Sequence, residues 1–175
     1  DEYEISILKT KAKGMVLTDD HAPVEDLLSP VVSGMARRRL AATCMEKAYT
    51  LRAEGRYEQS NAQLVRAARI YPRYTVDAYQ EIGLNLSSQG KWQEALEAIM
   101  TAVRYNDKAS DKKNIPQLYR GAGIALKRLG RESEARENFE KAIRGFEDGL
   151  RQIPDDLASV VALANTLAEI GNFER

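Results

Sequence analysis

The sequence predicts an all-α fold built from repeated helical hairpins. Glycines recur at positions 55, 90, 130 and 171, with gaps of 35, 40 and 41 residues. Apolar residues before these glycines follow one face of a helix, as Tyr79, Ile82, Gly83 and Leu86 do. A period of this length indicates stacked copies of one supersecondary unit.

Each of the four glycines is expected to end one helix and to open a tight turn into the next. Glycine adopts the left-handed conformation of a helix end without steric cost. Small residues should lie where the two antiparallel helices of a hairpin cross, and Tyr79 and Trp92 should fill the space beside the middle crossing. The predicted crossing pairs are Ala48 with Ser60, Gly83 with Ala95, and Gly123 with Ala135.

The repeats are expected to cover residues 41–175. Their approximate bounds are 41–75, 76–115, 116–156 and an incomplete 157–175. The polar stretch "NDKASDKKNIP" (106–116) predicts a loop. The second helix of the third repeat is expected to run on through "KAIRGFEDGLRQIP" (141–154), although Gly145 and Gly149 each weaken a helix by roughly 1 kcal/mol. Because the pattern stops within a repeat, we expect further chain or a partner to cover that end.

Residues 1–40 do not follow the repeat and are expected to form an N-terminal arm and capping helix. The stretch "SPVV" (29–32) places a serine N-cap before a proline, which favours a helix from about Pro30 to Glu54 with Gly34 as a candidate break. The segment 1–13 is compatible with a strand or a helix. Whether the arm caps the first repeat or tethers a partner stays open.

Composition excludes several classes of protein. The chain has 26 Lys and Arg against 26 Asp and Glu, so no net charge attracts it to nucleic acid or to an anionic membrane. No apolar run approaches the ~20 residues of a membrane-spanning helix. One cysteine cannot form a disulfide within the chain. We therefore expect a reducing, soluble compartment, such as the cytoplasm or an organelle matrix or stroma.

The sequence contains no recognisable catalytic, cofactor or metal motif. A single histidine, His21, and a single cysteine, Cys44, cannot build a zinc site or a catalytic triad, and Cys44 is expected to be a small core residue. The stretch "GAGIAL" (121–126) lacks the last glycine of a dinucleotide motif and follows no strand. The loop 106–116 lacks the glycine and glutamate of a calcium loop. We expect no enzyme activity and no cofactor.

The repeated spacing resembles the tetratricopeptide repeat, W-x2-L-G-x2-Y…A-x3-F…P. The middle repeat carries Tyr79, Ile82, Gly83, Leu86, Ala95 and Ile99 at these positions, and the third carries Tyr119, Ala122, Gly123, Leu126, Ala135 and Phe139. The first is weaker and ends at Pro72, and the fourth stops after Phe173. The resemblance covers about residues 41–175. It implies a right-handed superhelical solenoid in which the first helix of each hairpin lines a concave face.

The same resemblance implies a binding groove made by first-helix residues outside the packing stripe. The candidate groove residues are Met45, Tyr49, Arg52, Gln80, Leu84, Gln117, Arg120, Ile124, Lys127 and Asn165. The same register adds Ala42, Asp77, Ser87, Ala158, Val161 and Ala168. This mixture of apolar and cationic side chains suits a peptide or helix that carries an acidic group. The Lys/Asn clamp with which some family members hold chaperone C-termini is not matched, because Met45, Tyr49 and Glu81 occupy its positions.

The resemblance implies a non-catalytic scaffold or adaptor that binds proteins, within or during assembly of a larger complex. An alternative is a regulatory or targeting domain of a larger enzyme or chaperone-cofactor chain. Arg37, Arg38 and Arg39 form a short basic cluster that is either a docking patch or a solvated helix face. RNA binding through these arginines is the least favoured alternative, since it needs a broader basic stripe with aromatic residues.

Overall fold

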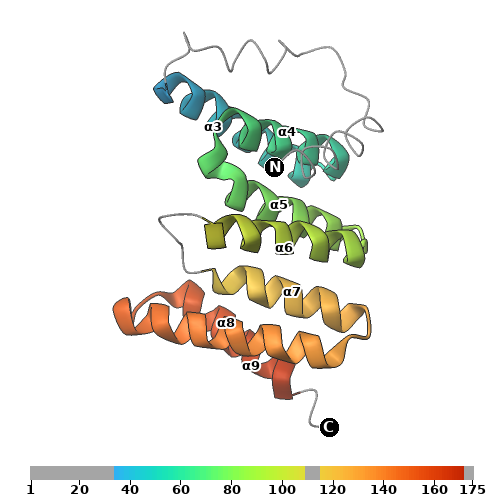
Figure 1. Ribbon diagram of the computed structural model, residues 1–175, viewed down its shortest axis with the longest axis vertical. Coiled ribbons are helices and arrows are strands. Elements are labelled where there is room, and N and C mark those ends of the chain that lie inside the picture. The colour runs from blue at the N-terminus through green and yellow to red at the C-terminus, as the bar shows by residue number, and fades with distance from the viewer. Residues whose placement is uncertain (1–33, 109–114, 172–175) are drawn as a thin grey trace. The chain divides into compact units, whose positions relative to one another are not determined.

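The computed structural model describes residues 34–108 and 115–171, and these two ranges are helical apart from short connections (Figure 1). They contain no strand, so the predicted all-α class is confirmed. The chain divides into an N-terminal unit, residues 1–78, and a C-terminal unit, residues 79–175. The helices are α3 (Gly34–Ala53), α4 (Tyr57–Ile70), the 3-10 helix η1 (Pro72–Tyr74), α5 (Thr75–Ser88), α6 (Trp92–Lys108), α7 (Pro116–Arg128), α8 (Glu132–Gln152) and α9 (Leu157–Gly171).

Three of the four predicted glycine turns are confirmed. Gly55, Gly90 and Gly130 have φ angles of 74°, 72° and 74°, in the left-handed region that favours glycine. In each turn the residue after the glycine donates its N–H to a carbonyl five residues earlier, as Arg131 does to Leu126 at 2.9 Å. This hydrogen bond closes the helix end in the way that the repeat pattern requires.

The turn predicted at Gly171 is wrong. Gly171 is the last residue of α9, and its backbone is not in the left-handed region. A glycine takes that conformation where the chain must leave one helix and fold back along it. Residues 172–175, which follow Gly171, lie outside the described residues.

Small residues permit the close helix crossings in the C-terminal unit, as predicted. A Cβ atom placed on Gly83 would lie 2.6 Å from Cγ1 of Ile99, and one placed on Gly123 would lie 2.6 Å from Cε1 of Phe139. Each glycine therefore leaves room for a large side chain of the second helix, Ile99 or Phe139. That side chain comes four residues after the alanine of the predicted crossing pair. Gly121 adds a contact that the sequence did not indicate, because its Cβ would lie 3.2 Å from Cδ1 of Ile99.

In the first hairpin, formed by α3 and α4, a hydrogen bond joins the two helices where they cross. The Oγ of Ser60 donates to the backbone oxygen of Ala48 at 2.8 Å, and both residues are buried. The hydroxyl thereby holds the two helices together where the other hairpins use a glycine. A buried hydroxyl with a partner avoids the cost of an unsatisfied polar group.

The two aromatic residues expected beside the middle crossing behave differently. Tyr79 is buried and stacks on Tyr105 with ring centroids 6.1 Å apart, as its predicted role requires. Trp92 is only half-buried, and its expected place beside the crossing stays a prediction. The guanidinium of Arg128 lies 5.5 Å from the Trp92 ring centroid, and the indole therefore covers a contact between α6 and α7.

The long second helix of the third repeat is confirmed. Helix α8 has 21 residues and continues through Gly145 and Gly149 to Gln152, just before Pro154. Its buried residues, Phe139, Ala142 and Phe146 among them, keep one apolar stripe facing the core beyond the length of an ordinary repeat helix. Packing along this stripe offsets the low helix propensity of the two glycines.

Two other segments differ in extent from the prediction. Helix α6 includes Asn106, which is buried, so the loop expected from residue 106 begins later, and residues 109–114 lie outside the described ranges. The described part of the first helix runs from Gly34 to Ala53. This helix is unbroken at residue 40, where the N-terminal arm was expected to end and the repeats to begin. That boundary stays a prediction. The helix start at Pro30, the segment 1–13 and His21 lie outside the described residues.

Candidate partner-binding surface

A shallow hollow in the N-terminal unit has a volume of about 290 Å³. Its lining on α3 comes from residues 42, 45, 46 and 49, whose spacing of three and four puts them on one helix face. Tyr74 of η1 and Asp77 of α5 close the other side. We call this the N-terminal hollow, and it is lined by Ala42, Met45, Glu46, Tyr49, Tyr74 and Asp77.

Five residues of this region were expected in the groove: Ala42, Met45, Tyr49, Arg52 and Asp77. Met45 is only 7% exposed, so it forms the floor and not an open wall, because its long flexible side chain packs into the core. Tyr49 is 42% exposed at the rim. The guanidinium of Arg52 lies 5.6 Å from the Tyr49 ring centroid, in a cation–π contact.

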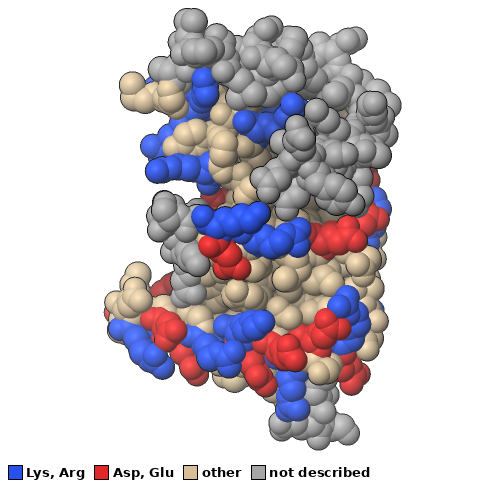
Figure 2. Space-filling view, in the orientation of Figure 1, with Lys and Arg blue, Asp and Glu red and all other residues tan. Residues whose placement is uncertain are grey.

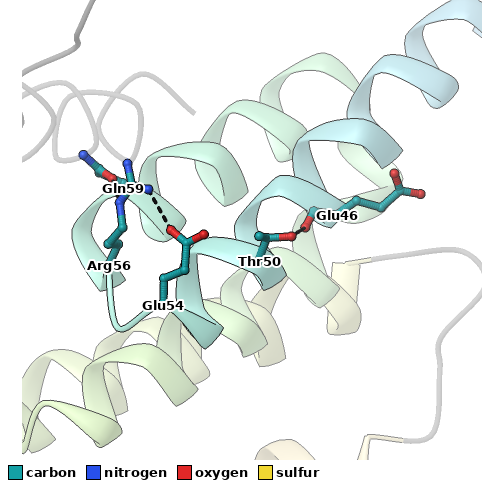
Figure 3. Close-up of polar contacts among 5 residues, drawn as sticks. All are labelled: Glu46, Thr50, Glu54, Arg56 and Gln59. Carbon is teal, nitrogen blue, oxygen red and sulfur yellow. Dashed lines mark hydrogen bonds and ion pairs between the residues drawn. The ribbon is translucent and has the colours of Figure 1, made fainter.

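Sequence reasoning missed Glu46 and Tyr74. Glu46 is exposed, and Thr50 donates its Oγ1 to the Glu46 backbone oxygen at 3.2 Å, while the carboxylate extends away from that contact (Figure 3). The signal for Glu46 was its position four residues after Ala42. Tyr74 could not be placed by repeat register, because it lies in η1 between two hairpins.

The polar contacts at the first hairpin turn have a structural role. Arg56 pairs with Glu54 at 2.7 Å and donates from Nε to Oε1 of Gln59 at 2.5 Å (Figure 3). The third-repeat equivalent, Arg131, makes two hydrogen bonds to Glu134. Both sets lie at exposed turns and hold the start of the second helix.

In the C-terminal unit, Arg120 of α7 is the most distinctive of the expected groove residues. Its side chain is half-buried, and its Nε is buried with no hydrogen-bond acceptor among the described residues. Gln117, three residues earlier, is exposed, and Ile124, four residues later, is half-buried. These three side chains share one face of α7.

Lys127, on the same helix, is held by an ion pair. Its Nζ lies 2.8 Å from Oε2 of Glu169 on α9, and the two side chains are 33% and 35% exposed. The lysine charge is therefore balanced from the next helix. Asn165 is exposed on α9, Gln80 is half-buried on α5, and Leu84 on α5 is 46% exposed.

The three consecutive arginines of α3 do not make one compact patch. Arg38 and Arg39 are exposed and Arg37 is half-buried. Successive residues on an α-helix point about 100° apart, so three in a row spread around most of the helix. Elsewhere, Lys and Arg alternate with Asp and Glu along α8 (Figure 2), which is the pattern of a solvated outer helix.

Helix α9 leaves much of its apolar surface uncovered by the described residues. Leu167, which was expected to need a covering helix, is 50% exposed, whereas Leu163 is half-buried. Leu157, Val160 and Val161 are also exposed. Contiguous apolar surface of this kind is typical of a contact with another protein surface.

Residues 34–108 and 115–171 contain few groups suited to metal binding or catalysis. No set of three or more His, Cys, Asp or Glu side chains there is arranged to hold a metal ion. Cys44 is buried, as expected, and burial raises the pKa of its thiol more than the charges of Arg66 and Lys47 lower it. Burial and the Asp107 carboxylate raise the pKa of Tyr119. None of the described helices is long and apolar enough to cross a membrane.

Comparison with known proteins finds a family model that matches the middle part of the chain. Residues 74–148 match the model of the tetratricopeptide repeat. A tetratricopeptide-like protein from Chlorobium tepidum is 16% identical with a TM-score of 0.60, over 81% of this chain and 98% of its own. The tetratricopeptide domain of Arabidopsis FLU is 17% identical with a TM-score of 0.59, over 64% and 98%.

A third similar structure is the first tetratricopeptide domain of Spaghetti (RPAP3), bound to the HSP90 peptide SRMEEVD. It is 16% identical with a TM-score of 0.54, over 77% of this chain and 95% of its own. A search of curated sequences gives no match. Residues 74–148 thus match the tetratricopeptide-repeat model, and the described helices have the fold of tetratricopeptide-repeat structures.

Proposed function

We propose that this protein is a non-catalytic scaffold or adaptor that binds a segment of another protein along its first helices. Arg120 carries the proposal. Its buried Nε has no acceptor among the described residues. A buried polar group without a hydrogen bond costs about 1–3 kcal/mol, so an acceptor supplied by a ligand would be stabilising.

A carboxylate is the acceptor that fits best. The guanidinium of arginine matches a carboxylate in a two-bond geometry, and such charge-assisted bonds are stronger than neutral ones. Gln117 and Ile124 lie on the same helix face within about 10 Å along the axis, since each residue rises 1.5 Å. The face therefore suits an acidic side chain or chain terminus with a polar group on one side and an apolar group on the other.

Lys127 contributes less to the binding of an acidic ligand than its position in the sequence suggested. Its ion pair with Glu169 must be displaced before the lysine can bind a ligand carboxylate. Arg120 is therefore the residue on which the acidic contact depends.

The similar structures support the mode of binding and not the partner. The tetratricopeptide domain of RPAP3 binds an acidic HSP90 peptide, which shows that this fold can hold such a segment. The clamp residues expected for chaperone C-termini are replaced here by Met45, Tyr49 and Glu81. We propose a different acidic protein segment as the ligand.

Selection of displayed random peptides on the full chain tests the proposal, followed by fluorescence anisotropy with the selected peptide. Arg120→Glu should weaken binding about 10–100-fold, the equivalent of one charge-assisted hydrogen bond. The control is Arg144→Glu, an exposed arginine on α8 that makes the same change of charge. Circular dichroism checks that both variants fold. Selected peptides that lack a carboxylate, or equal loss in both variants, would contradict the proposal.

A further inference from the structure

We propose that the N-terminal hollow binds a basic side chain, Lys or Arg, of the partner protein. The inference rests on the proposed function in that the ligand is a protein segment, but it concerns a separate site of opposite charge. The lining residues include two acidic ones, Glu46 and Asp77, two tyrosines, Tyr49 and Tyr74, and Met45. None of the six lining residues is a Lys or an Arg.

The size of the hollow fits one side chain. Sites for small molecules and cofactors usually have volumes of about 300–1,000 Å³ and enclose most of the ligand. The volume here, about 290 Å³, is at the lower limit, and the hollow is shallow. A long side chain that reaches in from a bound peptide matches these dimensions better than a free cofactor does.

The lining chemistry selects a cationic side chain with an aliphatic stem. Met45 is a buried apolar residue that can contact the stem, whereas the acidic residues Glu46 on α3 and Asp77 on α5 line the hollow from different elements. Lys and Arg carry this combination of an apolar stem and a charged head. Glu46 is exposed, and the Thr50 hydroxyl bonds to its backbone oxygen and not to its carboxylate, so the carboxylate can face a ligand.

The tyrosines add a second attraction for a cation. The Arg52 guanidinium lies 5.6 Å from the Tyr49 ring centroid, so a ligand cation must displace it or approach the ring from its other side. Tyr74 is oriented by an edge-on contact with Tyr71, with centroids 5.2 Å apart and ring planes at 75°. Aromatic rings combined with carboxylates are a common environment for cationic side chains.

A metal ion is a poorer occupant. Only two carboxylates line the hollow, and the described residues contain no group of three acidic, histidine or cysteine ligands. Hard cations such as Ca²⁺ need about six or more oxygen ligands. A lysine or arginine needs only the one or two acceptors that Glu46 and Asp77 offer.

The test uses peptides selected on the full chain and compares their composition between variants. On the wild-type protein we expect enrichment of Lys or Arg, and on the double variant Glu46→Gln, Asp77→Asn that enrichment should disappear. Arg120→Glu should keep the enrichment of basic residues and lose that of acidic ones. Failure of the Arg120 contact and failure of the hollow are thereby distinguishable.

A double-mutant cycle measures the contact directly. Replacing the basic residue of the selected peptide by norleucine should weaken binding to the wild type about tenfold and to the double variant by less than twofold. Glu58→Gln, an exposed acidic residue of α4 outside the hollow, is the matched control and should behave like the wild type. Equal loss on the wild type and the double variant would overturn the inference.

One further variant tests whether the hollow binds a lysine of this chain itself or a side chain of a partner protein. The chain itself carries Lys9, Lys11 and Lys13. If replacing these three by Gln in the full chain raises the affinity for the basic peptide tenfold or more, the occupant is this segment and the partner inference is overturned. Unchanged affinity supports a partner side chain.

Discussion

Gly123→Ala tests whether the close crossing of α7 and α8 depends on the absence of a side chain. The added Cβ would lie 2.6 Å from Cε1, 2.7 Å from Cδ1 and 3.0 Å from Cγ of Phe139. Carbon atoms attract best at about 3.5–4.0 Å, so the ring must move by about 1 Å. The ring is rigid and fully buried, which leaves it no free space to enter.

The expected effect is the difference between two opposing terms. Overpacking of a core costs about 1–3 kcal/mol, and the rigid ring places this site at the upper end. Alanine in a helix interior is more favourable than glycine by about 1 kcal/mol. We therefore expect the free energy of unfolding to fall by about 1–2 kcal/mol, and Tm by about 2–8 °C for a chain of this length.

Urea and thermal unfolding followed by circular dichroism measure this change. Gly171→Ala is the control, because a Cβ there meets no atom within 4 Å and its backbone is helical. It should change the free energy of unfolding by less than about 0.5 kcal/mol. Phe139→Leu, which removes the ring, should cost less in the Gly123→Ala protein than in the wild type. Wild-type stability of Gly123→Ala, or an equal cost of Phe139→Leu in both backgrounds, would refute the reasoning.

Three other predictions concern single contacts. Ser60→Ala removes the buried hydrogen bond to Ala48, so urea unfolding should show a loss of about 1 kcal/mol, and an unchanged midpoint would contradict the role of this hydroxyl. Burial keeps the Cys44 thiol protonated up to a higher pH than in the unfolded chain, where its pKa is about 8.5, so at pH 8 a thiol reagent should modify the native protein at least tenfold more slowly than the protein in urea. Comparable rates in the two states would show that Cys44 is accessible. Lys127→Met should reduce stability by less than about 1 kcal/mol, since its pair with Glu169 is one-third exposed, and the reduction should shrink at high salt.

The sequence alone determined the repeat organisation, because its causes are local. Gly55, Gly90 and Gly130 stand where each chain segment must reverse, and a left-handed backbone favours glycine whatever lies around it. Apolar spacing predicted the helices, and the late position of Pro154 predicted the extended α8. These features depend on neighbours a few residues apart, which the sequence shows directly.

Only the tertiary structure decided what the candidate surfaces offer to a ligand. Helix register indicated which face carries Met45 and Lys127, but it could not show that Met45 is buried or that Lys127 is paired with Glu169, 42 residues away. Nor could it bring Glu46 and Tyr74 to one hollow, since they belong to different elements. Burial, ion pairing and cavity shape depend on distances between helices, and these are set by the side chains that pack at each crossing and not by periodicity along the chain.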